Sequence, residues 1–362
     1  MKRNKLARLF ISIGILFLIA VVIKIISFFS AWIEANYSTN FYPKIGFFLR
    51  SITGWIPFSI GDIFYGLIAI WLIIKLIKFI RNIFQKKISW QSFLFGIGKI
   101  IQFCLWIYIV FNLLWGLNYD RLGIAYQLQL QPGVYTTEDL KNVTDSLLIK
   151  VNFYRKKLGD STIQYPSYQQ IFSETINAYK IVNNNFSFLN YQQRNIKPSL
   201  YGKLGNYLGF LGYYNPFTGE AQVNVTTPPF TIPYTCCHEV AHQLGYGTED
   251  EANFVGYLVA KSSSDPLFHY SVYFDLFNYA NGTLFYKDSS AARKNYRLLD
   301  TLVRRDEMLN RNFYLQYKNP FEPIITAIYG SYLKANRQPK GMETYNEVVA
   351  WLIAYQKKYG II

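Results

Sequence analysis

Three long apolar segments in the first third of the chain restrict its fold more than any other feature of the sequence. They cover roughly residues 9–33, 60–80 and 93–115. An α-helix of about 20 apolar residues spans the ~30 Å hydrocarbon core of a bilayer. The sequence therefore predicts three transmembrane helices within residues 1–116, followed by a separate domain over residues 117–362.

The first apolar segment has two interpretations. A basic stretch precedes it, which is typical of a cleaved signal peptide as well as of a membrane anchor. The apolar run is long for a signal peptide and lacks an Ala-x-Ala cleavage site, so we expect an uncleaved anchor. The basic residues concerned are Lys2, Arg3, Lys5 and Arg8.

Three charged residues fall within or beside the apolar segments. Asp62 and Lys99 would be an intramembrane functional pair if they met. The alternative, which we favour, places Asp62 at a helix N-terminus. Lys24 and Lys99 would then extend their amines towards the membrane surface.

The net charge of +15 is concentrated in the N-terminal third. Residues 1–115 contain thirteen Lys and Arg against two acidic residues, a net charge of +11, whereas the remaining 247 residues carry only +4. Basic residues that flank apolar segments are typical of membrane topology, not of a nucleic-acid-binding surface. We therefore expect the lipid bilayer as a partner and no nucleic acid.

The distribution of basic residues also predicts the orientation of the chain. The stretch between the first two segments contains only Lys44 and Arg50, whereas five basic residues lie at or after the end of the second segment. By the positive-inside rule, the N-terminus and residues 81–92 are cytoplasmic. Three crossings then place the later domain outside the cytoplasm, in a protein of the inner (cytoplasmic) membrane. The five basic residues are Lys75, Lys78, Arg81, Lys86 and Lys87.

Residues 238–242 read His-Glu-Val-Ala-His, and two of the three histidines of the chain lie there. On a helix, His238 and His242 share one face, where two imidazoles can ligate one Zn²⁺ and leave a position open for water. Glu239 then lies beside the metal, where a general base takes a proton from that water. The structural alternative is a pair of histidines held by hydrogen bonds in the core.

A third metal ligand is expected from the next helix, which begins after Thr248. Glu249 and Glu251 would point about 200° apart on that helix, so only one can face the motif. Bulky residues share the face of Glu251, and Glu251 fits a capping box with Thr248. Small residues share the face of Glu249 and allow close helix contact, so we favour Glu249. These small residues are Ala252, Asn253, Gly256 and Ala260.

The chain around the motif resembles a zincin metallopeptidase. Residues 221–225 alternate as a short strand, a Pro-rich turn follows, and the motif helix comes next. Glu249-x-x-Ala252-Asn253 is similar to the second zinc helix of gluzincins, although only six residues separate His242 from Glu249. The resemblance implies that Glu249 is a ligand and that Asn253 supports the zinc site.

The same resemblance implies a substrate-binding role for the strand upstream of the motif. Zincins pair an edge strand with an extended peptide, which assigns Gln222, Val223 and Asn224 to substrate binding. The alternative is an ordinary sheet strand. Over its whole length the chain also resembles a bacterial membrane family of unknown function that has this motif. That resemblance rests on residues 115–119 (Trp-Gly-Leu-Asn-Tyr), the motif and residues 332–336 (Tyr-Leu-Lys-Ala-Asn).

The remaining pattern is mostly helical, so we expect an α+β domain with a small sheet. A donor to the reaction's oxyanion, often His, Tyr or Arg, cannot be selected among the thirty-one tyrosines. His269 is expected to be structural. Helices are expected at residues 137–158, 166–182, 266–279, 289–305, 320–336 and 342–358.

These features together predict a zinc metallopeptidase that hydrolyses peptide or protein amide bonds at the extracytoplasmic membrane face. Glu239 would be the general base, and Zn²⁺ the cofactor. Two alternatives remain. One is a catalytically silent zinc-binding membrane scaffold, and the other is a zinc amidase that acts on an envelope polymer.

Overall fold

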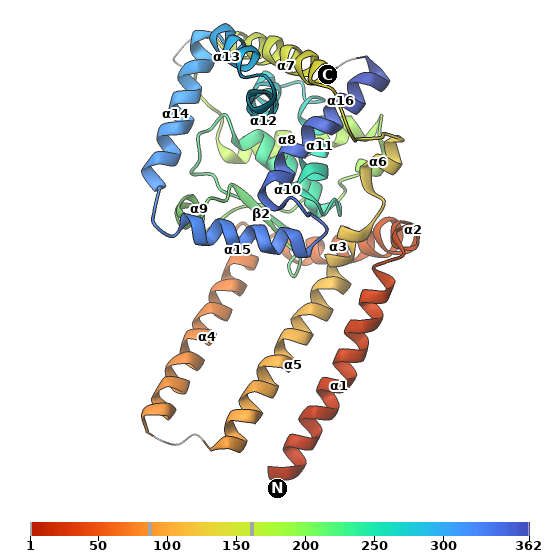
Figure 1. The fold of residues 1–362 in the computed structure, drawn as a ribbon, viewed down its shortest axis with the longest axis vertical. Helices are drawn as coiled ribbons and strands as arrows, with labels where there is room; N and C mark the ends of the chain where they lie inside the picture. Colours follow the sequence, from red (N-terminus) through yellow and green to blue (C-terminus); the bar gives the residue numbers. More distant parts are fainter. Residues whose placement is uncertain (1, 86–88, 160–162, 361) are drawn as a thin grey trace.

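The computed structural model describes residues 2–85, 89–159, 163–360 and 362. Three long helices extend from one side of a helical body (Figure 1). They are α1 (Lys2–Ile26), α4 (Ile60–Phe84) and α5 (Trp90–Leu114). Lys86 and Lys87, two of the basic residues that predict the orientation of the chain, lie outside the described residues.

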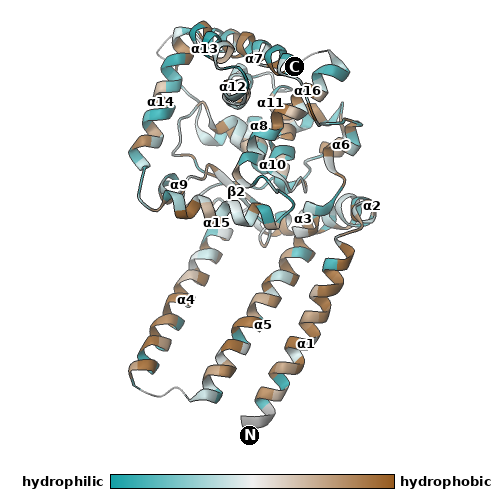
Figure 2. Ribbon diagram, in the orientation of Figure 1, coloured by the Kyte–Doolittle hydropathy of each residue, from teal (hydrophilic) through white to brown (hydrophobic). Residues whose placement is uncertain are grey.

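All three long helices have the length and composition needed to cross a membrane. Their surfaces are largely apolar (Figure 2), and most of their side chains are exposed. The expected bounds of the second and third segments agree with α4 and α5 within a few residues. The first helix ends at Ile26, not at Ile33, because the backbone changes direction at Phe29, whose φ is −103° and ψ 69°.

The chain then runs across the ends of the long helices, which the sequence did not predict (Figure 1). This stretch comprises α2 (Ser30–Trp32), a π-helix η1 (Ile33–Phe41) and α3 (Tyr42–Thr53). Tyr42 Oη and Arg50 Nη1 donate to the carbonyl of Gln243, at 2.7 and 3.2 Å. The last carbonyls of a helix lack partners within it, so these donors fix the C-terminus of the motif helix.

A small sheet lies beside the motif helix. Its strands are β1 (Ile196–Pro198), β2 (Gly212–Asn215) and β3 (Glu220–Val223), in the order β1-β3-β2. β3 pairs in parallel with β1 and antiparallel with β2. The expected edge position of residues 221–225 is therefore wrong, because both sides of β3 are paired. β2 is the edge strand on that side.

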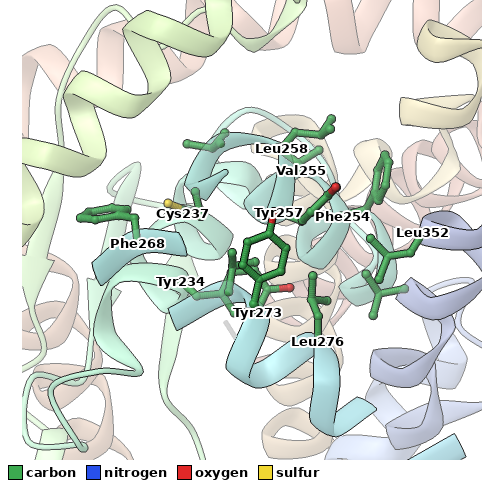
Figure 3. Close-up of a cluster of buried hydrophobic side chains, with 14 of the residues drawn as sticks. Tyr234, Cys237, Phe254, Val255, Tyr257, Leu258, Phe268, Tyr273, Leu276 and Leu352 are labelled. Atoms are coloured by element: carbon green, nitrogen blue, oxygen red, sulfur yellow. The ribbon is translucent and has the colours of Figure 1, made fainter. Parts of the chain in front are cut away.

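The core of the body is formed around α10 (Ile232–Gln243), all of whose residues are buried. α11 (Glu249–Ala260) and α12 (Pro266–Lys287) pack against it, and α16 (Val348–Tyr359) packs on α11 and α12. Figure 3 shows aromatic and aliphatic side chains of these four helices in contact, including Tyr257 of α11. Burial of this apolar surface is what orders the motif helix.

The other helices of the body follow the sequence pattern closely. Capping boxes start α7 (Thr137–Lys157) and α8 (Tyr168–Asn183), where Thr136 pairs with Asp139 and Ser167 with Gln170. The helix expected at residues 289–305 is divided at Asp300, which caps a new helix. α12 continues to Lys287, beyond the end expected at residue 279. The remaining elements are η2 (Gly116–Asp120), α6 (Gly123–Leu128), η3 (Ser187–Leu189), α9 (Gly202–Leu208), α13 (Ser289–Leu298), α14 (Thr301–Tyr317), α15 (Glu322–Ala335) and η4 (Gly341–Glu347).

Candidate metal centre

The motif histidines lie on one face of α10. Pro233 occupies the first turn of the helix, and the backbone N–H of Tyr234 donates to Ser271 Oγ at 3.0 Å. The four-residue spacing brings His238 Nε2 and His242 Nε2 to 3.1 Å from each other. Both imidazoles are buried.

Glu249, the first residue of α11, points its carboxylate at both imidazoles. Its Oε2 lies 3.2 Å from His238 Nε2 and 3.5 Å from His242 Nε2. α11 can approach this closely because Gly256 faces α10. A Cβ at Gly256 would lie 3.3 Å from the backbone nitrogen of His238. Gly256, one of the small residues on the Glu249 face, therefore allows α11 to lie close to α10.

The outer nitrogens of the imidazoles are fixed by oxygen acceptors. His238 Nδ1 lies 2.8 Å from Asn253 Oδ1, and His242 Nδ1 lies 2.7 Å from the carbonyl of Tyr246. A carbonyl accepts only, so each Nδ1 donates when Asn253 presents its amide oxygen. The Nε2 lone pairs then face each other and the Glu249 carboxylate. Three electron-rich atoms converge on one point.

This arrangement fits a tetrahedral metal. Metal–ligand distances of about 2.0–2.2 Å in a tetrahedron separate the ligand atoms by about 3.3–3.6 Å. The three separations among His238, His242 and Glu249 are 3.1, 3.2 and 3.5 Å. A cation would be stabilised by the anionic carboxylate and both lone pairs.

Glu239 lies next to this cluster, and its carboxylate is not fully hydrogen-bonded to the described residues. Its Oε2 has no hydrogen-bond partner among the residues that the structure describes. Burial raises the pKa of Glu239 to about 8, and the Glu249 carboxylate acts in the same direction. β2 passes so close that a Cβ at Gly212 would lie 2.6 Å from Glu239 Oε1. Glycine is therefore required at this point of the strand.

Glu251 does not contact the imidazoles. It accepts a hydrogen bond from the backbone N–H of Ile124 at 2.9 Å, at the start of α6. The expected capping box is absent, because the carboxylate is directed to α6 and reaches only the hydroxyl of Thr248, at 3.4 Å. Burial raises the pKa of Glu251 to about 7.

The residues expected to bind substrate serve the fold instead. The Gln222 side chain is fully buried and contacts Ser59 Oγ at 3.0 Å, at the start of α4. Asn224 lies beyond the end of β3 and donates to the carbonyl of Gly202 at 3.0 Å. Val223 is buried in the core. Their expected role in substrate binding is not supported, because β3 is enclosed on both sides.

The charged residues of the apolar helices do not pair with each other. Asp62 lies in the first turn of α4, as expected, and accepts from the backbone N–H of Leu200 at 2.6 Å. Lys99 Nζ donates to Gln102 Oε1 at 2.8 Å. His269 stacks on Tyr154 with ring centroids 4.3 Å apart, away from the metal cluster.

Tyrosines from the C-terminal region complete the site, and the sequence did not identify them. Tyr329 of α15 donates to Glu249 Oε1 at 3.0 Å, and its hydroxyl lies 3.2 Å from that of Tyr345. The Tyr345 ring is nearly parallel to that of His238, with centroids 6.4 Å apart. Tyr329 and Tyr345 are separated from the motif by about a hundred residues, so no local pattern distinguishes them from the other tyrosines.

A cavity of about 710 Å³ adjoins the cluster. Glu239, Glu249 and both motif histidines line it on one side, and residues of β2, α15 and η4 on others. It also extends between the long helices. A ligand in this cavity would therefore contact the candidate metal position and the Glu239 carboxylate together.

The comparisons with known proteins identify a family but no characterised relative. No curated protein and no solved structure matches the chain. A family model described as "Protein of unknown function (DUF3810)" matches residues 37–353, which include α4, α5 and every residue of the candidate metal centre. The chain therefore belongs to the DUF3810 family.

Proposed function

We propose that this protein is a zinc-dependent peptidase, anchored in the membrane by α1, α4 and α5, with its site at the extracytoplasmic face. One observation is its main support. His238, His242 and Glu249 direct three ligand atoms at one point, and a carboxylate with a free oxygen lies beside them. Zincin-type peptidases use this combination of ligands and base.

The residues of the chain divide the chemistry among them. When bound, Zn²⁺ supplies Lewis-acid polarisation of the scissile carbonyl and a lowered pKa for a water molecule. Glu239 takes a proton from the attacking water and later gives it to the leaving amine. The Asn253 amide and the Tyr246 carbonyl keep the imidazoles oriented with Nε2 towards the metal. The Tyr329 hydroxyl donates a hydrogen bond to Oε1 of Glu249, the carboxylate oxygen that does not face the imidazoles.

An extended substrate would pair with β2, not with β3. Gly212, Tyr213 and Tyr214 of this edge strand line the cavity beside Glu239. Strand addition provides main-chain hydrogen bonds that do not depend on side-chain sequence. β2 therefore takes the role that the sequence assigned to residues 221–225.

The orientation rests on the basic residues near the cytoplasmic ends of the long helices. The positive-inside rule then places the helical body outside the cytoplasm. A catalytically silent scaffold is less well supported, because it gives no reason to keep the Glu239 carboxylate buried with a free oxygen in a cavity.

The test is cleavage of a random decapeptide mixture by the full-length protein in lipid nanodiscs with added zinc. We expect cleavage by the wild type and at least a 10²-fold loss in Glu239→Gln, since the amide cannot accept the proton. Zinc content measured in parallel should be equal in the two proteins. Equal cleavage by both would contradict the proposed role of Glu239.

A further inference from the structure

The cavity beside the metal cluster reaches well down between the long helices. On α5 its wall includes Phe111, Tyr108 and Cys104. Cys104 lies ten positions before the end of α5 at Leu114, which corresponds to about 15 Å along a helix. That is about half of the hydrocarbon thickness of a bilayer. The site is therefore continuous with a space at membrane depth.

The helices around this space are not packed equally closely. α1 and α5 pack tightly, since a Cβ at Gly98 would lie 2.8 Å from Leu9 Cδ2. α4 stands apart from α5 in Figure 1. The two helices contact each other through the rings of Trp71 on α4 and Phe103 on α5, whose centroids are 5.7 Å apart. Above this contact Tyr65 of α4 lines the cavity opposite α5. The space between α4 and α5 above the Trp71–Phe103 contact, which we call the gap, is therefore part of the cavity.

The base of the helical body carries large exposed apolar side chains. α15 and α3 lie across the ends of the long helices (Figure 1). Ile328 of α15 is 67% exposed and Trp55, just after α3, is 79% exposed. Large exposed apolar side chains beside membrane-spanning helices are typical of a surface immersed in the membrane interface. The helical body therefore has exposed apolar side chains on the elements that lie across the ends of the long helices.

We infer that the substrate is a peptide held in the bilayer by an apolar anchor, which approaches the metal centre through the gap between α4 and α5. This inference rests on the proposed peptidase function. A helix is about 10–12 Å wide, so a cavity of about 710 Å³ holds little more than one turn of it. The anchor stays in the gap, and the peptide above it extends past β2 to Glu239.

The shared chemistry of the anchor is a long apolar group, either an acyl chain or a transmembrane helix. Three forms of one random decapeptide mixture separate the sources: free, palmitoylated at the N-terminus, and fused to a 20-residue Leu-Ala helix. All three are added to the full-length protein in nanodiscs. We expect at least one anchored form to be cleaved at least ten-fold faster than the free form, and the faster form identifies the anchor.

A plug in the gap provides the structural control. Cys104→Trp places a large ring in the cavity wall and should lower the ratio of anchored to free cleavage by about ten-fold. Ile101→Trp adds the same ring on α5 at an exposed residue outside the cavity wall and should leave the ratio unchanged. Equal cleavage of free and anchored peptides, or an unchanged ratio in Cys104→Trp, would overturn the inference.

A binding measurement separates this inference from the proposed activity. Glu239→Gln is incubated with anchored peptides that have a photoreactive diazirine in the anchor, and the cross-linked residues are mapped by mass spectrometry. Cross-links on α4 and α5 near Tyr65 and Tyr108 support the membrane route even if no peptide is cleaved. Cleavage of peptides without such cross-links supports the peptidase function and contradicts the membrane route.

Discussion

The orientation of each metal-facing side chain depends on one neighbouring acceptor or donor. Asn253 and Tyr246 accept from the imidazoles, and Tyr329 donates to Glu249. Such outer contacts typically change metal affinity by 10–100-fold. All three come from outside the five-residue motif, so the motif alone does not define the geometry of the site.

The two glutamates of α11 give the sharpest test at this scale. Glu249→Ala removes the carboxylate that faces both imidazoles, so we expect loss of bound zinc and of activity. Glu251→Ala should keep the zinc. It leaves the N–H of Ile124 without its acceptor, which costs about 1–3 kcal/mol of unfolding free energy.

Metal analysis and thermal unfolding of both variants check this prediction. Glu251→Gln is the matched control, since its amide oxygen can still accept from Ile124. Zinc retained in Glu249→Ala but lost in Glu251→Ala would mean that the third ligand is wrongly assigned.

At the scale of elements, β2 and α10 have to remain in close contact for Glu239 to be placed correctly. Gly212→Ala would put a methyl group 2.6 Å from Glu239 Oε1 and 2.8 Å from the carbonyl of Gln222. Either the strand or the carboxylate must move. A displacement of about 1 Å at a catalytic group can cost about 10²-fold in rate.

We therefore expect Gly212→Ala to lower kcat by about 10²-fold while zinc content stays at the wild-type level. Gly133→Ala is the control, because nothing lies within 4 Å of its added Cβ. Kinetics on both purified variants measure the effect. A similar loss in both, or none in Gly212→Ala, would show that the close approach of β2 has no role in catalysis.

Elements defined by local pattern could be predicted from the sequence, and those defined by distant contacts could not. The long helices follow from apolar length, and α7 and α8 from capping boxes. The central position of β3 depends on pairing with β1 from another part of the chain. The π-helix η1 is held in part by Glu34, which pairs with Arg121 at 2.7 Å. No local signal encodes either contact.

At the scale of the whole molecule, the long helices and the body act as one unit. Trp115, at the end of α5, donates to the carbonyl of His242 at 2.9 Å. α3 bonds the neighbouring carbonyl of Gln243. The end of the motif helix is therefore held directly by segments that adjoin the long apolar helices. These contacts fix the position of the candidate metal centre relative to those helices.

The orientation of the molecule is tested with reporters. A reporter fused after residue 120 should be active only outside the cytoplasm, and one fused near Lys87 only inside, since basic loops stay cytoplasmic. Alkaline phosphatase and green fluorescent protein fusions at both positions provide the measurement. The reverse pattern would place the metal centre in the cytoplasm and exclude extracytoplasmic substrates.

The central claim is that two histidines of one helix and Glu239 divide metal binding and proton transfer between them. Its most direct test is the zinc content of purified full-length wild type, His238→Ala, His242→Ala and Glu239→Gln, measured by elemental mass spectrometry. We predict one zinc per chain in the wild type and in Glu239→Gln, and loss of zinc in both histidine variants. Full zinc occupancy in His238→Ala and His242→Ala would contradict the account.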